Sequence, residues 1–223
     1  MVTGACLIAA PLVFVVSESI HPDDKTNATD EVAVIAGGLD RWYTAHALEI
    51  VGIALMVGAV LGLAHLLHER SPGYAVVGGG LALIGLVMGA ACFGAEGFGS
   101  YYLVKHAPRA AAIAAYDDMF NGARIIPFFA ASLLISVGLV VLAVQLWRTR
   151  VVASWQAGAI ALGAVAVAAS GPSGTQALSL AGMVLLFIGL APIGYMVLTE
   201  SDAEWAHTPE FHGFSRPAMG AAH

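Results

Sequence analysis

Apolar segments long enough to cross a membrane recur along the whole chain. An α-helix needs about 20 predominantly apolar residues to span the hydrocarbon core of a bilayer. We predict six such segments, at residues 2–19, 43–67, 74–96, 122–147, 151–170 and 175–198. Because a helix satisfies its backbone polar groups within one segment, we expect an all-α fold. The predicted architecture is one transmembrane domain over residues 1–198, a six-helix bundle, followed by a polar tail at residues 199–223.

The composition is typical of a protein embedded in a lipid bilayer. We therefore predict the bilayer as a partner of this chain. Hydrophobic residues make up 59% of the 223 positions and charged residues 11%, whereas soluble domains contain about 25% charged residues. The net charge is −6, and the sequence contains no stripe of Lys and Arg residues. Nucleic acid is therefore excluded as a partner. A membrane-protein partner or a second copy of the chain is left open.

Glycine pairs indicate that the helices approach one another closely. Gly58 and Gly62 stand four positions apart, and so do Gly85 and Gly89, in a chain with 26 glycines. Lipid supplies no hydrophobic drive for helix association, and small residues let helix backbones come into contact. We therefore expect a tightly packed bundle.

The connections between the segments differ in length and predict an orientation. Residues 21–40 and 97–121 form two long connections, which we expect on one face of the bundle. The short turns carry Arg70, Arg148 and Arg150, and cytoplasmic loops collect basic residues. We therefore predict a multi-pass protein of the cell membrane, specifically a bacterial inner membrane, with both termini cytoplasmic and the long connections outside.

His46 and Glu49 stand inside an apolar segment, three residues apart. Side chains at this spacing share one face of a helix. Trp42, which precedes them, is expected with Tyr43 at the headgroup boundary, where aromatic rings prefer to lie. Glu49 would then lie about 10 Å inside that boundary. An ionisable group at such a depth faces the bundle interior or a water-filled cavity.

Other polar residues are expected at the same end of the bundle. His21 follows the first segment and Glu96 ends the third. With His46 and Glu49 they predict a polar pocket near the extracytoplasmic face. The other residues expected to line it are Asp23, Asp24, His106, Asp117, Asp118 and Arg124.

The residue types in this pocket permit more than one chemistry. His21, His46, Glu49 and Glu96 form a candidate ligand set for a divalent metal, because imidazole and carboxylate suit Zn, Fe, Mn or Cu(II). His21 and His46 are also candidate axial ligands of a haem. The sequence contains no HExxH or CxxC motif, and no catalytic residue is predicted. Alternatively, His46 and Glu49 are structural and hydrogen-bond to neighbouring helices or to Arg124.

A short pattern suggests a resemblance. "HP" at residues 21–22 and "RWYTAHAL" at residues 41–48 resemble segments of multispanning bacterial membrane proteins of actinobacterial type, a group without a settled activity. The resemblance covers the first third of the chain. It implies a multispanning membrane protein and emphasises His21, Trp42 and His46, and it implies no reaction.

Three classes of function remain open on the sequence. The first, which we favour, is a non-catalytic subunit or a protein that handles a small molecule or ion. The second is a membrane metalloenzyme or haem-binding redox protein that uses His21, His46 and Glu49. The third is a structural accessory subunit of a larger membrane complex.

Overall fold

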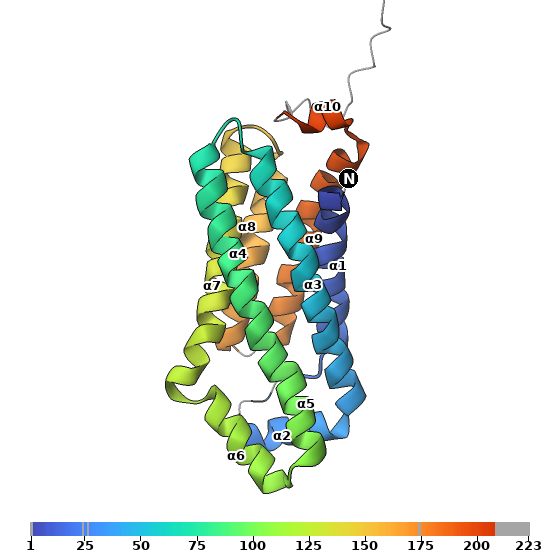
Figure 1. Cartoon of the computed structure of the whole chain (residues 1–223), viewed down its shortest axis with the longest axis vertical. Coiled ribbons are helices and arrows are strands. Elements are labelled where there is room, and N and C mark those ends of the chain that lie inside the picture. The colour runs from blue at the N-terminus through green and yellow to red at the C-terminus, as the bar shows by residue number, and fades with distance from the viewer. Residues whose placement is uncertain (1, 24, 26, 174, 208–223) are drawn as a thin grey trace, which may run out of the picture.

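The computed structural model of the chain describes residues 2–23, 25, 27–173 and 175–207 (Figure 1). Regular structure in these residues is entirely helical. The helices are α1 (Val2–Ile20), α2 (Ala28–Gly37), α3 (Leu39–Leu66), α4 (Pro72–Gly94), α5 (Ser100–His106), α6 (Arg109–Phe120), α7 (Ile126–Arg148), α8 (Ser154–Ser173), α9 (Gln176–Thr199) and α10 (Asp202–Trp205). A π-helical turn, η1 (Ala95–Gly99), and a 3₁₀ turn, η2 (Gly122–Ile125), precede α5 and α7.

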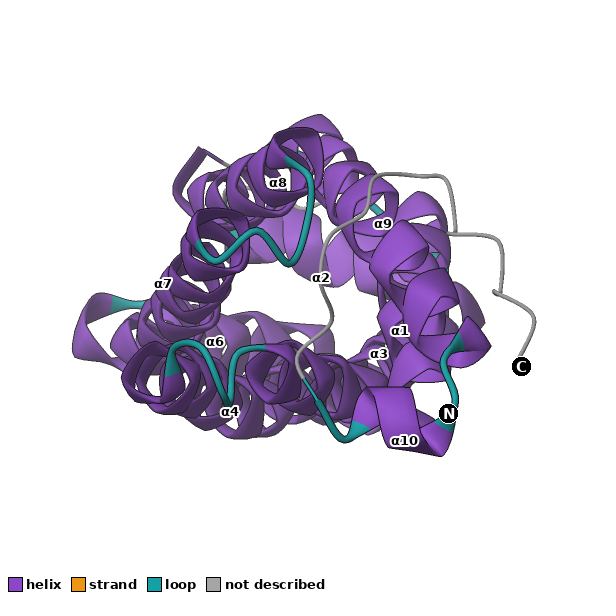
Figure 2. Cartoon of the chain, turned by 90° about the horizontal axis from the view of Figure 1, so that it is seen from above, coloured by secondary structure: helices purple, strands orange, loops and turns teal. Residues whose placement is uncertain are grey.

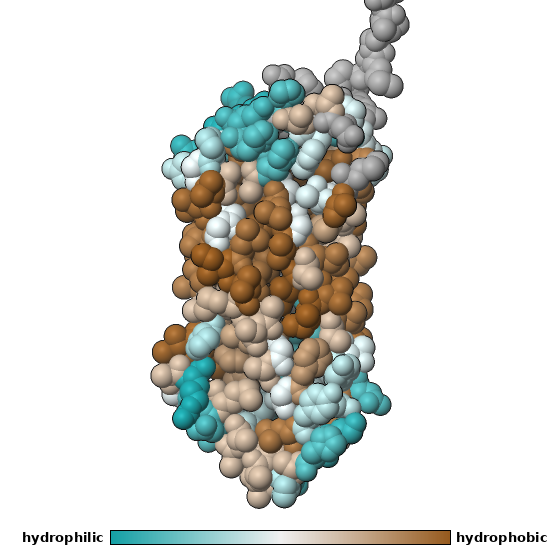
Figure 3. All heavy atoms as spheres, in the orientation of Figure 1, coloured by the Kyte–Doolittle hydropathy of each residue, from teal (hydrophilic) through white to brown (hydrophobic). Residues whose placement is uncertain are grey.

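The predicted six-helix membrane bundle is confirmed. Within the described residues, six helices are long and apolar enough to cross a membrane. Figure 3 shows a hydrophobic band around the middle of the molecule and hydrophilic residues towards both ends. Large apolar side chains such as Val76, Val87 and Leu133 point outward in this region, with exposed fractions of 74%, 70% and 59%. This outer surface is therefore suited to contact with lipid.

The six long helices form a closed ring, which Figure 2 shows from one end. The order around the ring is α1, α3, α4, α7, α8 and α9, and α9 packs against α1 to close it. Towards the α3–α4 and α7–α8 turns, buried leucines such as Leu63, Leu66, Leu142 and Leu146 fill the interior. The interior is thus packed at this end of the ring.

Glycines allow close contact between neighbours in the ring. A Cβ atom added at Gly85 of α4 would lie 2.6 Å from the backbone nitrogen of Ile135 on α7. One added at Gly58 of α3 would lie 2.6 Å from Cys6 Sγ on α1. At Gly89 the nearest atom would be 3.7 Å away, so this glycine does not mark a close backbone contact. The other three glycines of the two predicted pairs do face a neighbouring helix closely.

We expect Gly85→Leu to destabilise the bundle, because the new side chain would force α4 and α7 apart. Overpacking typically costs about 1–3 kcal/mol, which lowers the unfolding temperature of a protein of this size by about 2–4 °C per kcal/mol. Gly80→Leu is the matched control, since nothing lies within 4 Å of its added Cβ. Thermal unfolding in detergent measures both. Equal unfolding temperatures for the two variants would contradict the close α4–α7 contact.

Both long connections lie at the same end of the ring, as predicted. Figure 1 shows α2, α5 and α6 together there, at the end away from the N-terminus. The third predicted segment does not stop at residue 96. Instead α4 continues through η1 into α5, giving a span of 35 residues from Pro72 to His106. At 1.5 Å per residue this is about 52 Å, longer than the roughly 30 Å hydrocarbon core, so it projects beyond the membrane.

The ring of Trp42, which we expected at the headgroup boundary, does not lie at the surface of the molecule. Its side chain is completely buried, and its indole Nε1–H donates a hydrogen bond to the carbonyl of Gly97 at 2.9 Å. Trp147 and Trp155, near the opposite end of the ring, have exposed fractions of 53% and 43%. Trp42 is therefore no marker of the membrane surface, and the depth of Glu49 that was counted from it stays a prediction.

Candidate ligand-binding cavity

A cavity of about 640 Å³ lies inside the helix ring, and we call it the central cavity. All six long helices contribute to its lining, together with α2, α6 and the segment before α2. Its apolar lining includes Phe14, Ile53, Met56, Leu86, Leu139 and Leu186. Cavities that hold small molecules usually measure about 300–1,000 Å³ and are mostly apolar with a few polar groups. The central cavity fits this description.

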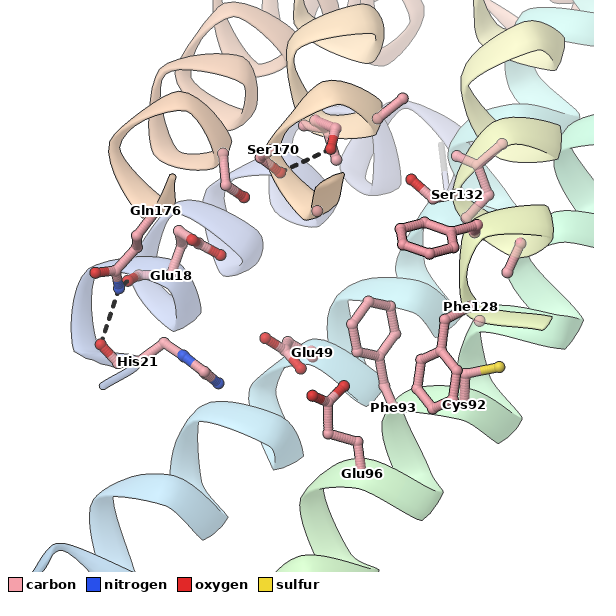
Figure 4. Close-up of a pocket in the computed structure, with 18 of the residues that line it drawn as sticks. Glu18, His21, Glu49, Cys92, Phe93, Glu96, Phe128, Ser132, Ser170 and Gln176 are labelled. Carbon is pink, nitrogen blue, oxygen red and sulfur yellow. Dashed lines mark hydrogen bonds between the residues drawn. The ribbon is translucent and has the colours of Figure 1, made fainter. Parts of the chain in front are cut away.

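Polar groups gather at the end of the cavity that faces α2 and α6. The acidic residues in the lining are Glu18, Glu31, Glu49, Glu96 and Asp117, and the other ionisable ones include Lys25, His21 and His46. Figure 4 shows the carboxylates of Glu49 and Glu96 turned towards each other, with His21 on the Glu18 side of the cavity. Carboxylates therefore dominate this end of the lining.

His21 and His46 form a ring cluster with Trp42. The centroids of the two imidazoles are 4.9 Å apart, and the ring of His46 lies 4.3 Å from that of Trp42. His46 Nδ1 is 3.0 Å from the carbonyl oxygen of Trp42, and His21 Nδ1 is 2.7 Å from that of Pro22. A carbonyl only accepts, so each Nδ1 carries the hydrogen in these bonds.

The position of His46 depends on the π-helical turn between α4 and α5. A Cβ atom at Gly97 would lie 2.3 Å from both Cβ and Cγ of His46, so only glycine leaves room for the imidazole. The carbonyl of Gly97 also accepts the Trp42 indole hydrogen bond. Single π-turns inside α-helices occur frequently at functional sites. Here the turn lets η1 approach the first two turns of α3 closely.

Side chains from two other helices fix the end of α1 beside the cavity. The last carbonyls of a helix have no partner within it. Arg41 of α3 donates from Nε to the carbonyl of Ile20 at 2.5 Å and from Nη2 to that of His21 at 3.1 Å. Gln176 of α9 donates from Nε2 to the carbonyls of Glu18 and His21, at 3.0 and 2.9 Å. These bonds hold Glu18 and His21 at the cavity wall.

The predicted pocket residues fall into two groups. His21, His46, Glu49, Glu96 and Asp117 line the central cavity. The other predicted pocket residues that the structure describes do not line it: Asp23, His106, Asp118 and Arg124.

The residues outside the lining lie at the surface of the same end. Asp118 and Arg124 pair with each other at 2.5 Å, with side chains 65% and 62% exposed. Arg124 is therefore not the partner of His46 or Glu49. Asp23 lies 4.0 Å from Lys25, and the ring of His106 stacks on Tyr102. Asp24 lies outside the described residues.

Two acidic lining residues were not predicted from the sequence. Glu18 stands three residues before His21 near the end of α1, and this spacing could have linked it to the pocket. Glu31 of α2 is 1% exposed, and its Oε2 accepts a hydrogen bond from the backbone nitrogen of Lys25 at 2.5 Å. Nothing in the sequence around Glu31 indicates that α2 turns this side chain inward.

The predicted metal and haem ligands stay predictions. Within the described residues, no group of three or more His, Cys, Asp or Glu side chains is arranged to hold a metal ion. His46 Nε2 lies 3.9 Å from Glu49 Oε2. The two imidazoles lie against each other, so they would have to separate before they could bind opposite faces of a haem.

Comparisons with protein-family models, with curated proteins and with solved structures find no match to this chain. The function is therefore argued from the central cavity itself.

Proposed function

We propose that this protein is a multi-pass membrane protein that binds a small amphiphilic molecule in the central cavity and handles it without catalysis. The observation that carries the proposal is a cavity of about 640 Å³ enclosed by all six long helices, apolar along most of its wall and polar at one end. An amphiphile matches both parts of such a wall. Its apolar portion would remain out of water while its polar group meets the ionisable residues.

Exposed residues in the lining indicate how a ligand reaches the cavity. Asn27, Asp117, Asn121 and Thr175 line it and are exposed to solvent. They lie at the start of α2, at the end of α6 and between α8 and α9. The opposite end of the ring is filled by buried leucines. A ligand would therefore arrive from the α2 and α6 side.

The membrane orientation that we propose places this opening outside the cell. The short turns at the closed end carry Arg70, Arg148 and Arg150, and basic residues accumulate in cytoplasmic loops. Both termini would then be cytoplasmic, in the inner membrane of a bacterium. The ligand would be taken from, or released to, the extracytoplasmic side.

This orientation predicts which positions react with an impermeant thiol reagent in intact cells. With both native cysteines replaced, Ala114→Cys on the exposed face of α6 should be labelled. Ser71→Cys in the α3–α4 turn should be labelled only after the membrane is permeabilised. The reverse pattern would show that the closed end faces outward.

Filling the cavity should abolish binding of an apolar probe. We choose 1-aminoanthracene, which is uncharged at pH 7 and fluoresces more strongly in apolar surroundings. Ser132 lines the cavity, and Figure 4 shows it on the cavity wall formed by α7. Ser132→Trp should eliminate the saturable fluorescence that wild-type protein adds to that of detergent micelles, because the indole would occupy the ligand's space.

The matched control for this experiment is the neighbouring residue. Leu133 is 59% exposed on the outer surface, so Leu133→Trp places the same side chain towards lipid or detergent. This variant should keep the saturable signal. If neither wild type nor Leu133→Trp shows saturable binding, or if Ser132→Trp binds as wild type does, the proposed function is wrong.

One observation favours a second candidate, a metal-dependent protein. Histidines that ligate metals almost always donate the hydrogen of the other ring nitrogen to a carboxylate, a backbone carbonyl or water. His21 and His46 both have Nδ1 directed at a backbone carbonyl, which leaves Nε2 as the nitrogen with a lone pair. Elemental analysis and the absorption spectrum of His46→Ala distinguish this candidate from a structural role.

A further inference from the structure

We infer that the ligand of the central cavity carries a positive charge and is an amphipathic amine. Its ammonium group would lie at Glu49 and Glu96, and its apolar portion would extend along the inner walls of α4, α7 and α9. This inference rests on the proposed function, since it names the chemical class of the molecule that the cavity binds.

The charges in the lining favour a cation. Five carboxylate side chains face the cavity. Among the described residues, Lys25 is the only Lys or Arg in the lining. Its Nζ also lies 4.0 Å from the carboxylate of Asp23, which is outside the lining. Coulomb interactions gain strength where water is scarce. An anionic ligand would therefore be repelled at the polar end, and a cationic one attracted.

The position of Glu49 and Glu96 assigns the place of the charge. Glu49 of α3 is 8% exposed, and Glu96 stands in the π-helical turn η1, which packs against α3. Figure 4 shows their carboxylates pointing towards each other in the cavity. Two ionised carboxylates in this arrangement repel each other, and a cation between them removes that repulsion. An ammonium group offers three N–H donors for such acceptors.

The walls next to these carboxylates suit an organic cation better than a bare metal ion. Phe93 and Phe128 also line the cavity, and Figure 4 shows both on the same side of it as Glu96; aromatic faces attract cations. Deeper in the cavity, Ile53, Leu86 and Leu186 offer only apolar surface. A metal ion at Glu49 and Glu96 would leave this surface without a ligand. An amine with an attached hydrocarbon would cover it.

The test compares three ligands that share one apolar portion. These are 6-phenylhexylamine, 6-phenylhexan-1-ol and 6-phenylhexanoate, which are cationic, neutral and anionic at pH 7. The affinity of each ligand is measured by its displacement of 1-aminoanthracene from wild-type protein in an uncharged detergent. We expect the amine to bind at least about tenfold more tightly than the alcohol, which corresponds to about 1.4 kcal/mol, and the carboxylate to bind more weakly than the alcohol.

Isosteric variants then locate the charge preference. Glu49→Gln and Glu96→Gln should each reduce the preference for amine over alcohol about tenfold or more, while the affinity for the alcohol stays close to that of wild type. Asp118→Asn is the control, because this carboxylate lies at the same end of the protein but pairs with Arg124 outside the cavity. It should leave the preference unchanged.

The outcomes separate the two proposals. If the alcohol displaces the probe but the amine binds no better, the positive charge of the ligand is overturned and the cavity remains a binding site. If the preference for the amine survives in both Glu→Gln variants, the placement of the charge at Glu49 and Glu96 is overturned. If no ligand displaces the probe and Ser132→Trp has no effect on it, the proposed function fails, and the inference fails with it.

Discussion

Gly97→Ala should lower the unfolding temperature of the purified protein by about 6–12 °C. The added methyl carbon would lie 2.3 Å from both Cβ and Cγ of His46, and His46 is fixed between Trp42 and His21 in a buried ring cluster. Overpacking of this kind costs up to about 3 kcal/mol, and each kcal/mol shifts the midpoint by about 2–4 °C for a chain of this length. Thermal unfolding followed by circular dichroism in detergent measures the shift.

Gly99→Ala provides the matched control for Gly97→Ala. It lies in the same π-helical turn, and nothing is within 4 Å of its added Cβ atom. Alanine is favoured over glycine in a helix by up to about 1 kcal/mol, so this variant should unfold at the wild-type temperature or slightly above it. If both variants behave alike, the close contact between Gly97 and His46 is absent.

The bundle could be predicted from the sequence because bilayer thickness dictates the length of each apolar segment. Six segments of suitable length were enough to predict six helices, and charged residues or, at residues 171–174, a Gly-Pro-Ser-Gly turn separated them. The order of the helices in the ring could not be predicted in this way. The contact between α4 and α7 depends on Gly78, Gly85 and Gly138, and the sequence shows which residues are small but not which helices they bring together.

The inward direction of His46 and Glu49 also followed from the sequence. Their spacing along a helix and the cost of exposing charge to lipid both predicted a polar interior. The depth of the pair was counted from Trp42, whose burial removes it as a marker of the membrane surface. The indole of Trp42 finds its hydrogen-bond acceptor inside the protein, at the carbonyl of Gly97. Composition alone does not distinguish such a tryptophan from one at a membrane surface.

Residues of the α2 and α6 end were harder to assign. Asp117 and Asp118 are adjacent, yet Asp117 lines the cavity and Asp118 pairs with Arg124 at the surface. Successive residues on a helix point about 100° apart, so the rotation of α6 decides which carboxylate faces inward. The rotation of α2 does the same for Glu31. These short helices carry too weak an apolar pattern for their buried face to be predicted from the sequence.

His46→Ala should destabilise the protein about as strongly as Gly97→Ala. Removal of a large buried side chain costs on the order of 3 kcal/mol, and this one is 1% exposed and in contact with two other rings. Thermal unfolding should register a loss of about 6–12 °C. The double variant Gly97→Ala/His46→Ala should unfold well above the temperature expected from adding the two losses, because the alanine at position 97 no longer meets an imidazole. Strict additivity would contradict the contact.

The same variant separates a structural His46 from a ligand of a metal or haem. We expect elemental analysis and the absorption spectrum to be identical for wild type and His46→Ala, because the imidazole is fixed by Trp42 and Gly97 and its Nε2 lies 3.9 Å from Glu49 Oε2, wider than the spacing of two ligands about 2.0–2.2 Å from one tetrahedral ion. Glu49→Gln should likewise change neither measurement. A stoichiometric metal or a haem band in wild type that disappears in His46→Ala, while the variant still folds, would overturn the structural role and establish His46 as a ligand.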